Sequence, residues 1–248
     1  MTIIKTEEQL AVMRESGKIM KATFEYAKSV LKPGITTAEL DKLLEKFIES
    51  YGATAPCIGY EGYPAATCIS LNDTVIHGIP SDRIVIENGD IVSIDIVVGY
   101  KGLMTDAART FPVGTISEEK KKLIKVTEEC FFKAVERLRD GSPLGDIGYA
   151  VSSHAEANGF SVVRAFTGHG VGVYMHEDPA VNNYGKKGTG FRLRKGMTIA
   201  IEPMINAGTR DIKILSDGWT VKTVDGKPSA HYENTVAITD DGVEILTL

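Results

Sequence analysis

Two aspartates in one predicted β-hairpin, residues 91–113, are the clearest chemical signal in the chain. IVSIDIVV is an apolar, β-branched run, GYKG is turn material, and LMTDAARTFPV resumes strand character. With Tyr100 and Lys101 at the centre of the turn, Asp95 lies directly opposite Asp106 on one face, with Cβ atoms ~5 Å apart. Two such carboxylates repel each other and are costly to desolvate, which favours a cation between them. The alternatives are a protonated carboxyl group or a register shifted by one residue, which would separate the two onto opposite faces.

Further candidate ligands lie in other stretches. His169 and His176 lie seven residues apart in the glycine-rich TGHGVGVYMHEDP, where glycines let groups approach a ligand closely. Glu202 ends a buried apolar run in TIAIEP, and Glu233 lies in the β-branched SAHYENTVAIT. His77 lies at a predicted loop in VIHGIP. Each of these alone has an ordinary explanation, a satisfied histidine or a strand acid facing water.

Taken together, Asp95, Asp106, Glu202, Glu233 and one histidine form a carboxylate-rich cluster. Four carboxylates place about four negative charges in one pocket, which roughly two divalent cations would neutralise. Two metal ions ~3.5–4 Å apart are the usual device for hydrolysis by a bridging water. Oxygen ligands with one imidazole suit Mn²⁺, Fe²⁺ or Co²⁺ at least as well as Zn²⁺, so the residues leave the metal undecided.

Composition narrows the class of protein. The 248 residues are 43% hydrophobic and 25% charged, as in ordinary soluble proteins. The net charge of −5 gives no support to nucleic acid or an anionic membrane as the main partner. The longest apolar runs are too short to span a bilayer, and MTIIKTEEQL lacks the apolar core of a signal peptide. Cys57, Cys68 and Cys130 form no CxxC pair, which argues against a disulfide framework and favours a cytoplasmic location.

Periodicity and capping residues predict four helices that must position these groups. Capping boxes begin the first two helices at Thr6 and Thr36, and Ser117 caps the third. Residues 53–87 are predicted as strands and loops, and residues 160–248 as strand-rich. The four predicted helices span about 7–31, 37–51, 118–139 and 146–157.

The two halves of the chain resemble one unit repeated. An offset of 107 residues relates glycines that end helices or precede strands, and it also relates two acids. The constant offset predicts two helix–helix–sheet halves related by a pseudo-twofold, whose sheets meet and present one acid each to a shared cleft. The pairs are Gly34 and Gly141, Gly52 and Gly159, Gly89 and Gly196, and Asp95 and Glu202.

Five motifs together resemble the type I, bacterial-form methionine aminopeptidases: YPAATCISLNDTVIHGIP, IDIVVGYKGLMTDAART, TGHGVGVYMHEDP, IEPMINAG and DGWTVKT…SAHYENT. The resemblance covers nearly the whole chain. It implies the pita-bread α/β (α+β) fold around a central antiparallel sheet, as one catalytic domain over 1–248 with repeat halves at about 7–113 and 117–248. It implies removal of the initiator methionine from nascent proteins when the next residue is small. The chain begins almost at its first helix, without the zinc-binding extension of eukaryotic cytosolic forms, and it lacks the helical insertion of type II forms.

The resemblance also implies roles for individual residues. Asp106 and Glu233 would bridge two metal ions, Asp95 would bind one of them, and His169 with Glu202 the other. His77 and His176 match substrate-contacting histidines. The positions that match the lining of the methionine pocket are Cys57, Tyr60, Tyr63, Cys68 and Trp219. Without the resemblance, the aromatic residues and cysteines among them would be read as core.

The implied mechanism is attack of a metal-bridging water on the first peptide bond. Glu202 would take the proton of that water and pass it to the leaving amine. His176 would donate to the developing oxyanion, and His77 would contact the same peptide or the leaving nitrogen. The free α-amino group of methionine would bind the metal held by Asp95, which explains why an acylated terminus would not be cut.

Two departures and two rival functions stay open. Met175 stands where an aromatic residue is common in the family, which bears on the shape of the pocket, and Glu61 stands where some relatives carry histidine, which bears on its charge. One rival is a pita-bread peptidase that cuts Xaa-Pro bonds, although those relatives generally carry an additional N-terminal domain. The other is a non-enzymatic pita-bread binding protein, which would have lost metal ligands. The family implies a monomer, and a weak ribosome association stays open although no basic patch announces it.

Overall fold

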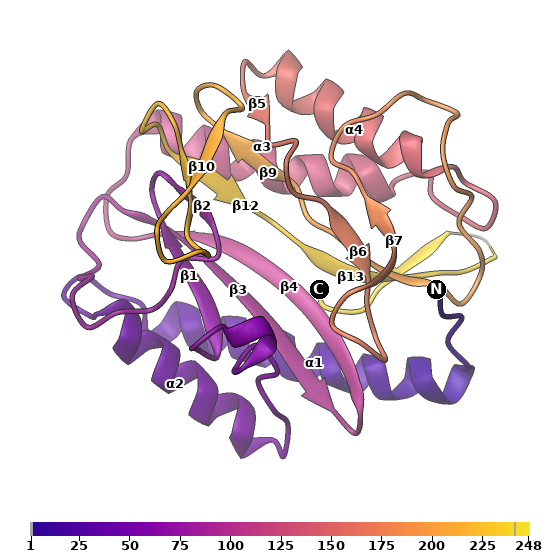
Figure 1. Ribbon diagram of the computed structural model, residues 1–248, viewed down its shortest axis with the longest axis horizontal. Coiled ribbons are helices and arrows are strands. Elements are labelled where there is room, and N and C mark those ends of the chain that lie inside the picture. The colour runs from indigo at the N-terminus through magenta and orange to yellow at the C-terminus, as the bar shows by residue number, and fades with distance from the viewer. Residues whose placement is uncertain (1, 241) are drawn as a thin grey trace.

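The computed structural model describes residues 2–240 and 242–248 of the chain. Figure 1 shows two pairs of helices on opposite outer sides of the molecule, with the strands between them. The helices α1 and α2 cover one side, and α3 and α4 cover the other. Their bounds are Glu7–Val30 for α1, Thr37–Ser50 for α2, Glu118–Val135 for α3 and Leu144–Ala157 for α4.

The predicted helix starts are largely confirmed. The hydroxyl groups of Thr6 and Thr36 each accept from the backbone N–H of the third helical residue. The backbone N–H of each threonine donates to the side chain of that same residue, so both capping boxes are present. The predicted end of α3 at about Arg139 is wrong, because the helix stops at Val135. Beyond that end, the Asp140 N–H donates to the Thr239 carbonyl and the Gly141 N–H donates to the Leu193 carbonyl, so this stretch bonds to the C-terminal half instead of continuing the helix.

Four antiparallel sheets make up the layer between the helix pairs. Their strand orders are β1-β3-β4, β10-β11-β2, β12-β9-β5 and β14-β13-β8-β6-β7. Asp95 and Asp106 lie in strands of the first of these sheets, and His169 lies in a strand of the last. Glu202 directly follows β8, and Glu233 lies between β12 and β13. The strand bounds are Thr67–Leu71 for β1, Thr74–Ile76 for β2, Ile91–Tyr100 for β3, Leu103–Pro112 for β4, Ser161–Val162 for β5, Gly168–Gly170 for β6, Glu177–Val181 for β7, Thr198–Ile201 for β8, Met204–Asn206 for β9, Ile212–Ile214 for β10, Val221–Thr223 for β11, Ser229–His231 for β12, Asn234–Ile238 for β13 and Val243–Ile245 for β14; a 3₁₀ turn, η1, spans Tyr60–Gly62.

The two halves keep the offset seen in the sequence. The helices α2 and α4 begin and end 107 residues apart, and so do two isolated β-bridges, Thr36–Val85 and Pro143–Arg192. The glycines of all three repeat pairs have positive φ, a conformation that side chains other than glycine rarely adopt. Their φ angles are 95° and 81° for Gly34 and Gly141, 69° and 84° for Gly52 and Gly159, and 98° and 81° for Gly89 and Gly196.

The predicted register of the 91–113 hairpin is wrong by two positions. Tyr100 pairs with Leu103, so the turn consists of Lys101 and Gly102, with φ of 48° and 80°. Positive φ at both central residues is the geometry that matches the twist of a two-residue hairpin. Gly99 is not turn material but a strand residue, and a Cβ there would lie 2.5 Å from the Thr54 hydroxyl.

Each half is built around a large apolar cluster, and a seam of hydrogen bonds joins the halves. One cluster packs α1 and α2 on the sheet of β1 and β3, and the other packs α3 and α4 on β8, β9 and β13. At the seam, the Glu233 N–H donates to the Ala108 carbonyl at 2.9 Å, and the Thr235 hydroxyl accepts from the Asp106 N–H at 2.8 Å. Within the described ranges, no helix is long and apolar enough to cross a membrane.

Candidate metal centre and adjoining cavity

Asp95 and Asp106 lie diagonally across the hairpin. Asp95 pairs with Ala108, and Asp106 pairs with Val97. Because the register differs from the predicted one by two, the side chains still share one face, as period-two alternation requires. The Thr235 hydroxyl, which accepts from the Asp106 N–H, donates in turn to the Asp106 carbonyl at 2.9 Å, so β13 holds this part of β4 in place.

His169, in β6, is oriented for metal binding. Its Nδ1 lies 2.9 Å from the Gly170 carbonyl, which can only accept, so Nδ1 carries the proton and Nε2 has a free lone pair. That Nε2 lies 3.7 Å from Asp106 Oδ2 and 3.6 Å from Glu202 Oε1. A metal-ligating histidine usually donates its other ring N–H to a carbonyl or carboxylate in this way, which fixes the tautomer and the orientation of the ring.

The two glutamates close the cluster from the C-terminal half. Glu202 directly follows β8, and its carbonyl accepts from the Asn183 amide at 2.9 Å. Glu233 lies between β12 and β13 and is 2% exposed. Its carbonyl accepts from the Arg109 guanidinium, which holds the backbone and leaves the carboxylate free to face the cluster.

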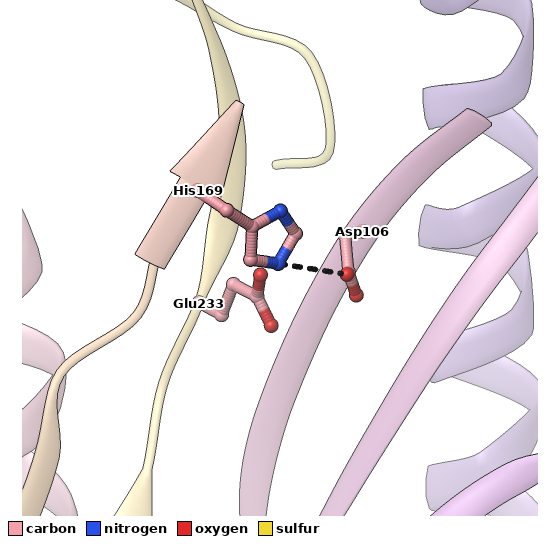
Figure 2. Close-up of side chains that lie close together, drawn as sticks. All are labelled: Asp106, His169 and Glu233. Atoms are coloured by element: carbon pink, nitrogen blue, oxygen red, sulfur yellow. Dashed lines mark ion pairs between the residues drawn. The ribbon is translucent and has the colours of Figure 1, made fainter. Parts of the chain in front are cut away.

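The donor set fits a divalent cation. One ligand atom each of Asp106, His169 and Glu233 lies within 4.8 Å of the others, and Figure 2 shows the three side chains converging from three segments. Asp106 Oδ1 and Glu233 Oε1 are buried and have no hydrogen-bond partner among the residues that the structure describes. Buried oxygens without partners cost free energy that a bound cation would recover.

Protonation of the cluster reflects crowding in a buried site. Burial, with repulsion from neighbouring carboxylates, raises the pKa of Asp106, Glu202 and Glu233 well above their usual range. Burial raises the pKa of Asp95 to about 7. Burial lowers the pKa of His169 to about 3, so its ring is neutral near pH 7, the form that binds metals. A divalent cation would reverse the preference of the carboxyl groups for their protons.

A cavity of about 500 Å³ adjoins the cluster. It opens onto Asp95 and Asp106 at one end and becomes apolar at the other. Burial raises the thiol pKa of Cys57 and Cys68, which keeps both neutral and makes a cysteine nucleophile implausible. All eight residues predicted to contact substrate line this cavity: Cys57, Tyr60, Tyr63, Cys68, His77, Met175, His176 and Trp219.

Ring contacts organise the walls of the cavity. Trp219 meets Tyr63 edge-on with centroids 5.1 Å apart, and it meets His77 edge-on at 6.0 Å. The Tyr63 hydroxyl shares its one proton between the carbonyls of Thr67 and Gly78, at 3.1 and 3.2 Å, so this group is satisfied within the protein. His77 has a positive φ of 58°, an unusual conformation for a histidine.

His176 lies where the cavity meets the metal cluster. Its Nδ1 is 2.7 Å from the Tyr60 hydroxyl, and its ring packs against that of His169 with centroids 4.2 Å apart. Burial lowers the pKa of His176 and lowers that of His77 to about 4, so both rings are neutral near pH 7. Glu61, on the rim of the cavity, opposes this effect at His176.

Sequence reasoning missed two residues. His231 is 2% exposed, and neither ring nitrogen has a hydrogen-bond partner in the described part of the chain. Its Nε2 lies 3.9 Å from Glu202 Oε2 and 4.0 Å from Glu233 Oε2. Because side chains alternate along a strand, the two-residue spacing in SAHYENT would have placed His231 on the same face as Glu233. Phe166, which lines the cavity and meets His77 edge-on, gave no such signal.

Comparison with known proteins agrees with this site. The profile of metallopeptidase family M24 matches residues 11–240, so the chain belongs to this family and is a metal-dependent peptide-bond hydrolase. A methionine aminopeptidase of Clostridium perfringens is 53% identical over 248 residues, covering 100% of this chain and 99% of that protein. The crystal structure of methionine aminopeptidase from Rickettsia prowazekii superposes with a TM-score of 0.98 at 44% identity, covering all of both chains.

A more distant structure distinguishes this chain from the peptidases that cut Xaa-Pro bonds. Prolidase from Pyrococcus furiosus superposes with a TM-score of 0.80 at 25% identity, but the match covers 66% of that chain. The predicted resemblance to methionine aminopeptidases is therefore confirmed. The pita-bread expectation is confirmed with it, because the antiparallel sheets and helix pairs match those structures over the full length.

Proposed function

We propose that this chain is a metal-dependent aminopeptidase that removes the N-terminal methionine from nascent polypeptides when the second residue is small. One observation carries the proposal: a cavity lined by sulfur and aromatic groups adjoins the cavity of the buried carboxylates, and Asp95, Asp106 and His176 line both. The carboxylate cavity suits hydrolysis at a cation, and the cavity lined by sulfur and aromatic groups suits the unbranched thioether of methionine.

The residues that would hold two divalent cations are Asp95, Asp106, His169, Glu202 and Glu233. When bound, the cations would supply a water of lowered pKa and positive charge for the scissile carbonyl. Asp106 and Glu233, whose free oxygens face the cluster, are the bridging candidates. The oxygen-rich donor set is compatible with Mn²⁺, Fe²⁺, Co²⁺ or Zn²⁺.

Glu202, His176 and His77 then have separate roles in proton transfer, hydrogen-bond donation and substrate contact. Glu202 takes the proton from the attacking water and returns it to the leaving amine. Tyr60 donates to Nδ1 of His176, which leaves the proton on Nε2, where it can stabilise the developing oxyanion. His77, held by Phe166 and Trp219, contacts the peptide beyond the scissile bond.

The wider proposal treats residues 1–248 as one catalytic domain with repeat halves at about 7–113 and 117–248. The seam between β4 and the Glu233 segment supports this, because each half contributes ligands and neither holds the full set. We further propose a cytoplasmic monomer that meets its substrate at the ribosome through transient contacts.

The test uses protein stripped with a chelator. Mn²⁺, Co²⁺, Fe²⁺ or Zn²⁺ is added back, and release of methionine from a Met-Ala-Ser peptide is followed. Formyl-Met-Ala-Ser and Ala-Pro-Ser are the control peptides. Metal-dependent release from Met-Ala-Ser alone is the expected result.

Each other outcome has a defined meaning. Cleavage of the proline peptide would move the chain to the Xaa-Pro peptidases, and no release with any metal would favour a binding protein. Light scattering tests the monomer, and co-sedimentation with ribosomes tests the transient association. Metal content measured after dialysis gives the number of ions per chain.

A further inference from the structure

A buried ion pair joins the start of the chain to the loop that carries His176. The Lys5 ammonium donates to Glu177 Oε2, and the two side chains are 0% and 1% exposed. The residues are 172 positions apart in sequence. Neither belongs to the metal cluster or lines the cavity described above.

The second oxygen of Glu177 shapes the loop itself. Oε1 accepts from the N–H groups of Val173 and Tyr174, at 2.7 and 3.1 Å. The carboxylate thus closes residues 173–177 into a compact loop. Met175 and His176, the two loop residues that line the cavity, lie between the bonded N–H groups and Glu177.

Lys5 is a fixed anchor for that loop. Its own N–H donates to the Gly196 carbonyl at 2.8 Å, and Ile4 bridges to Met197 beside it. The Lys5 side chain runs over Gly172, where an added Cβ would lie 2.4 Å from Lys5 Cε. Thr2 bridges to Asp178 on the far side of the loop. The N-terminal segment therefore contacts both ends of the 172–178 stretch.

The ion pair between Lys5 and Glu177 is better explained by the loop conformation that it specifies than by added stability. An apolar pair of similar volume would stabilise a buried contact as well or better, so the charges are weak evidence for stability. A carboxylate that is paired with Lys5 and also accepts from two backbone N–H groups instead specifies one loop conformation. His176, next in sequence to Glu177, inherits that conformation, and its ring must meet both Tyr60 and His169.

We propose that Lys5 and Glu177 form a positioning pair that holds the 173–177 loop and so sets the His176 ring for catalysis. The proposal rests on the proposed function, which assigns His176 its role. Lys5 and Glu177 touch neither substrate nor metal and act through His176.

The test is a double-mutant cycle with Lys5→Met and His176→Ala. Because a displacement of about 1 Å can cost about 100-fold in rate, Lys5→Met should lower kcat roughly 10- to 100-fold while KM changes less than about 3-fold. In the His176→Ala background, Lys5→Met should lower kcat by less than about 2-fold. Glu177→Gln, which keeps an oxygen acceptor for the loop, provides a second cycle if Lys5→Met folds poorly.

Controls separate positioning from stability. Arg14→Met removes a half-exposed ion pair remote from the loop, Arg14 with Glu244, and should leave kcat within about 2-fold. Melting temperature and metal content are measured for every variant. Imidazole NMR should show altered His176 signals in Lys5→Met, while His154, paired with Glu129 away from the cavity, stays unchanged.

The outcomes are distinguishable. Equal kcat loss from Lys5→Met with and without His176 would overturn the positioning pair, as would unchanged His176 signals. A wild-type protein that releases no methionine with any metal would overturn the proposed function, and the NMR comparison would then decide the positioning pair alone.

Discussion

The two ends of the site, the carboxylate cluster and the apolar cavity beside it, differ in whether their polar groups have partners within the protein. At the acidic end, carboxylate oxygens such as Asp106 Oδ1 and Glu233 Oε1 are buried without partners in the described structure. At the apolar end, the Tyr63 hydroxyl already has two backbone carbonyls as acceptors for its proton, and both thiols are held neutral by burial. The acidic end therefore depends on an external cation, whereas the apolar end is complete on its own. Chemistry and selectivity are thus separable within one site.

The largest expected effect comes from the acidic end. Glu202→Gln should lower kcat about 1,000-fold, because a neutral amide cannot accept a proton from the attacking water. Steady-state methionine release measures this, and circular dichroism checks the fold. Glu61→Gln, which changes an exposed acid on the rim of the adjoining cavity, is the matched control and should lose far less. Near wild-type turnover of Glu202→Gln would rule out its role in proton transfer.

The second prediction concerns stability in the absence of metal. The pKa of an unfolded-state histidine is about 6.5, so the opposing contribution of the buried histidines fades as pH rises above that value, and the raised pKa values of the carboxyl groups dominate. The folded state then holds protons that the unfolded state has lost, including that of Asp95 with its pKa of about 7. The free energy of unfolding should fall as pH rises from 6.5 to 8, by about 1.4 kcal/mol per pH unit for each retained proton.

Denaturant unfolding at the two pH values, with chelator and with saturating Mn²⁺, measures this dependence. Bound cations should abolish the loss and raise stability at pH 8, since a ligand at 100 times its Kd adds about 2.7 kcal/mol. Metal-free stability that stays level or increases with pH would mean that the carboxyl groups are not crowded as described.

At the apolar end, Trp219→Leu should raise KM about 10-fold and leave kcat nearly unchanged. The side chain of Trp219 packs against Tyr63 and His77 and would contact methionine equally in the ground and transition states. Metal content should be unaffected. Tyr149→Leu, which truncates an aromatic side chain 46% exposed on α4, is the control. A large fall in kcat would show that the two ends are not separable.

The smallest effect is expected at Met175. Met175→Phe should change kcat/KM for Met-Ala-Ser less than about 3-fold, because it exchanges one apolar cavity wall for another. Its effect should appear in the tolerance for larger second residues, measured with a series of Met-Xaa-Ser peptides. An unchanged series would remove Met175 from the determinants of specificity.

Much of the site could be predicted from the sequence because its signals are local. Capping boxes marked α1 and α2, alternation put Asp95 and Asp106 on one face, and the 107-residue offset paired Asp95 with Glu202. The hairpin register could not be predicted correctly, because a glycine can mark either a turn or a strand position where another segment approaches closely. Gly102 serves the turn, while Gly99 serves a close approach to Thr54, and only the packed structure tells them apart.

Other features were decided by tertiary structure alone. The path of the chain after α3 is fixed by residues far along the sequence, because the carbonyls of Thr239 and Leu193 accept from the N–H groups of residues 140 and 141. The lack of hydrogen-bond partners for His231 is visible only once the surrounding groups are in place. The Lys5–Glu177 pair joins residues from opposite parts of the chain. A sequence determines which groups are available and how they alternate locally, but burial and pairing over long separations follow from how the whole chain packs.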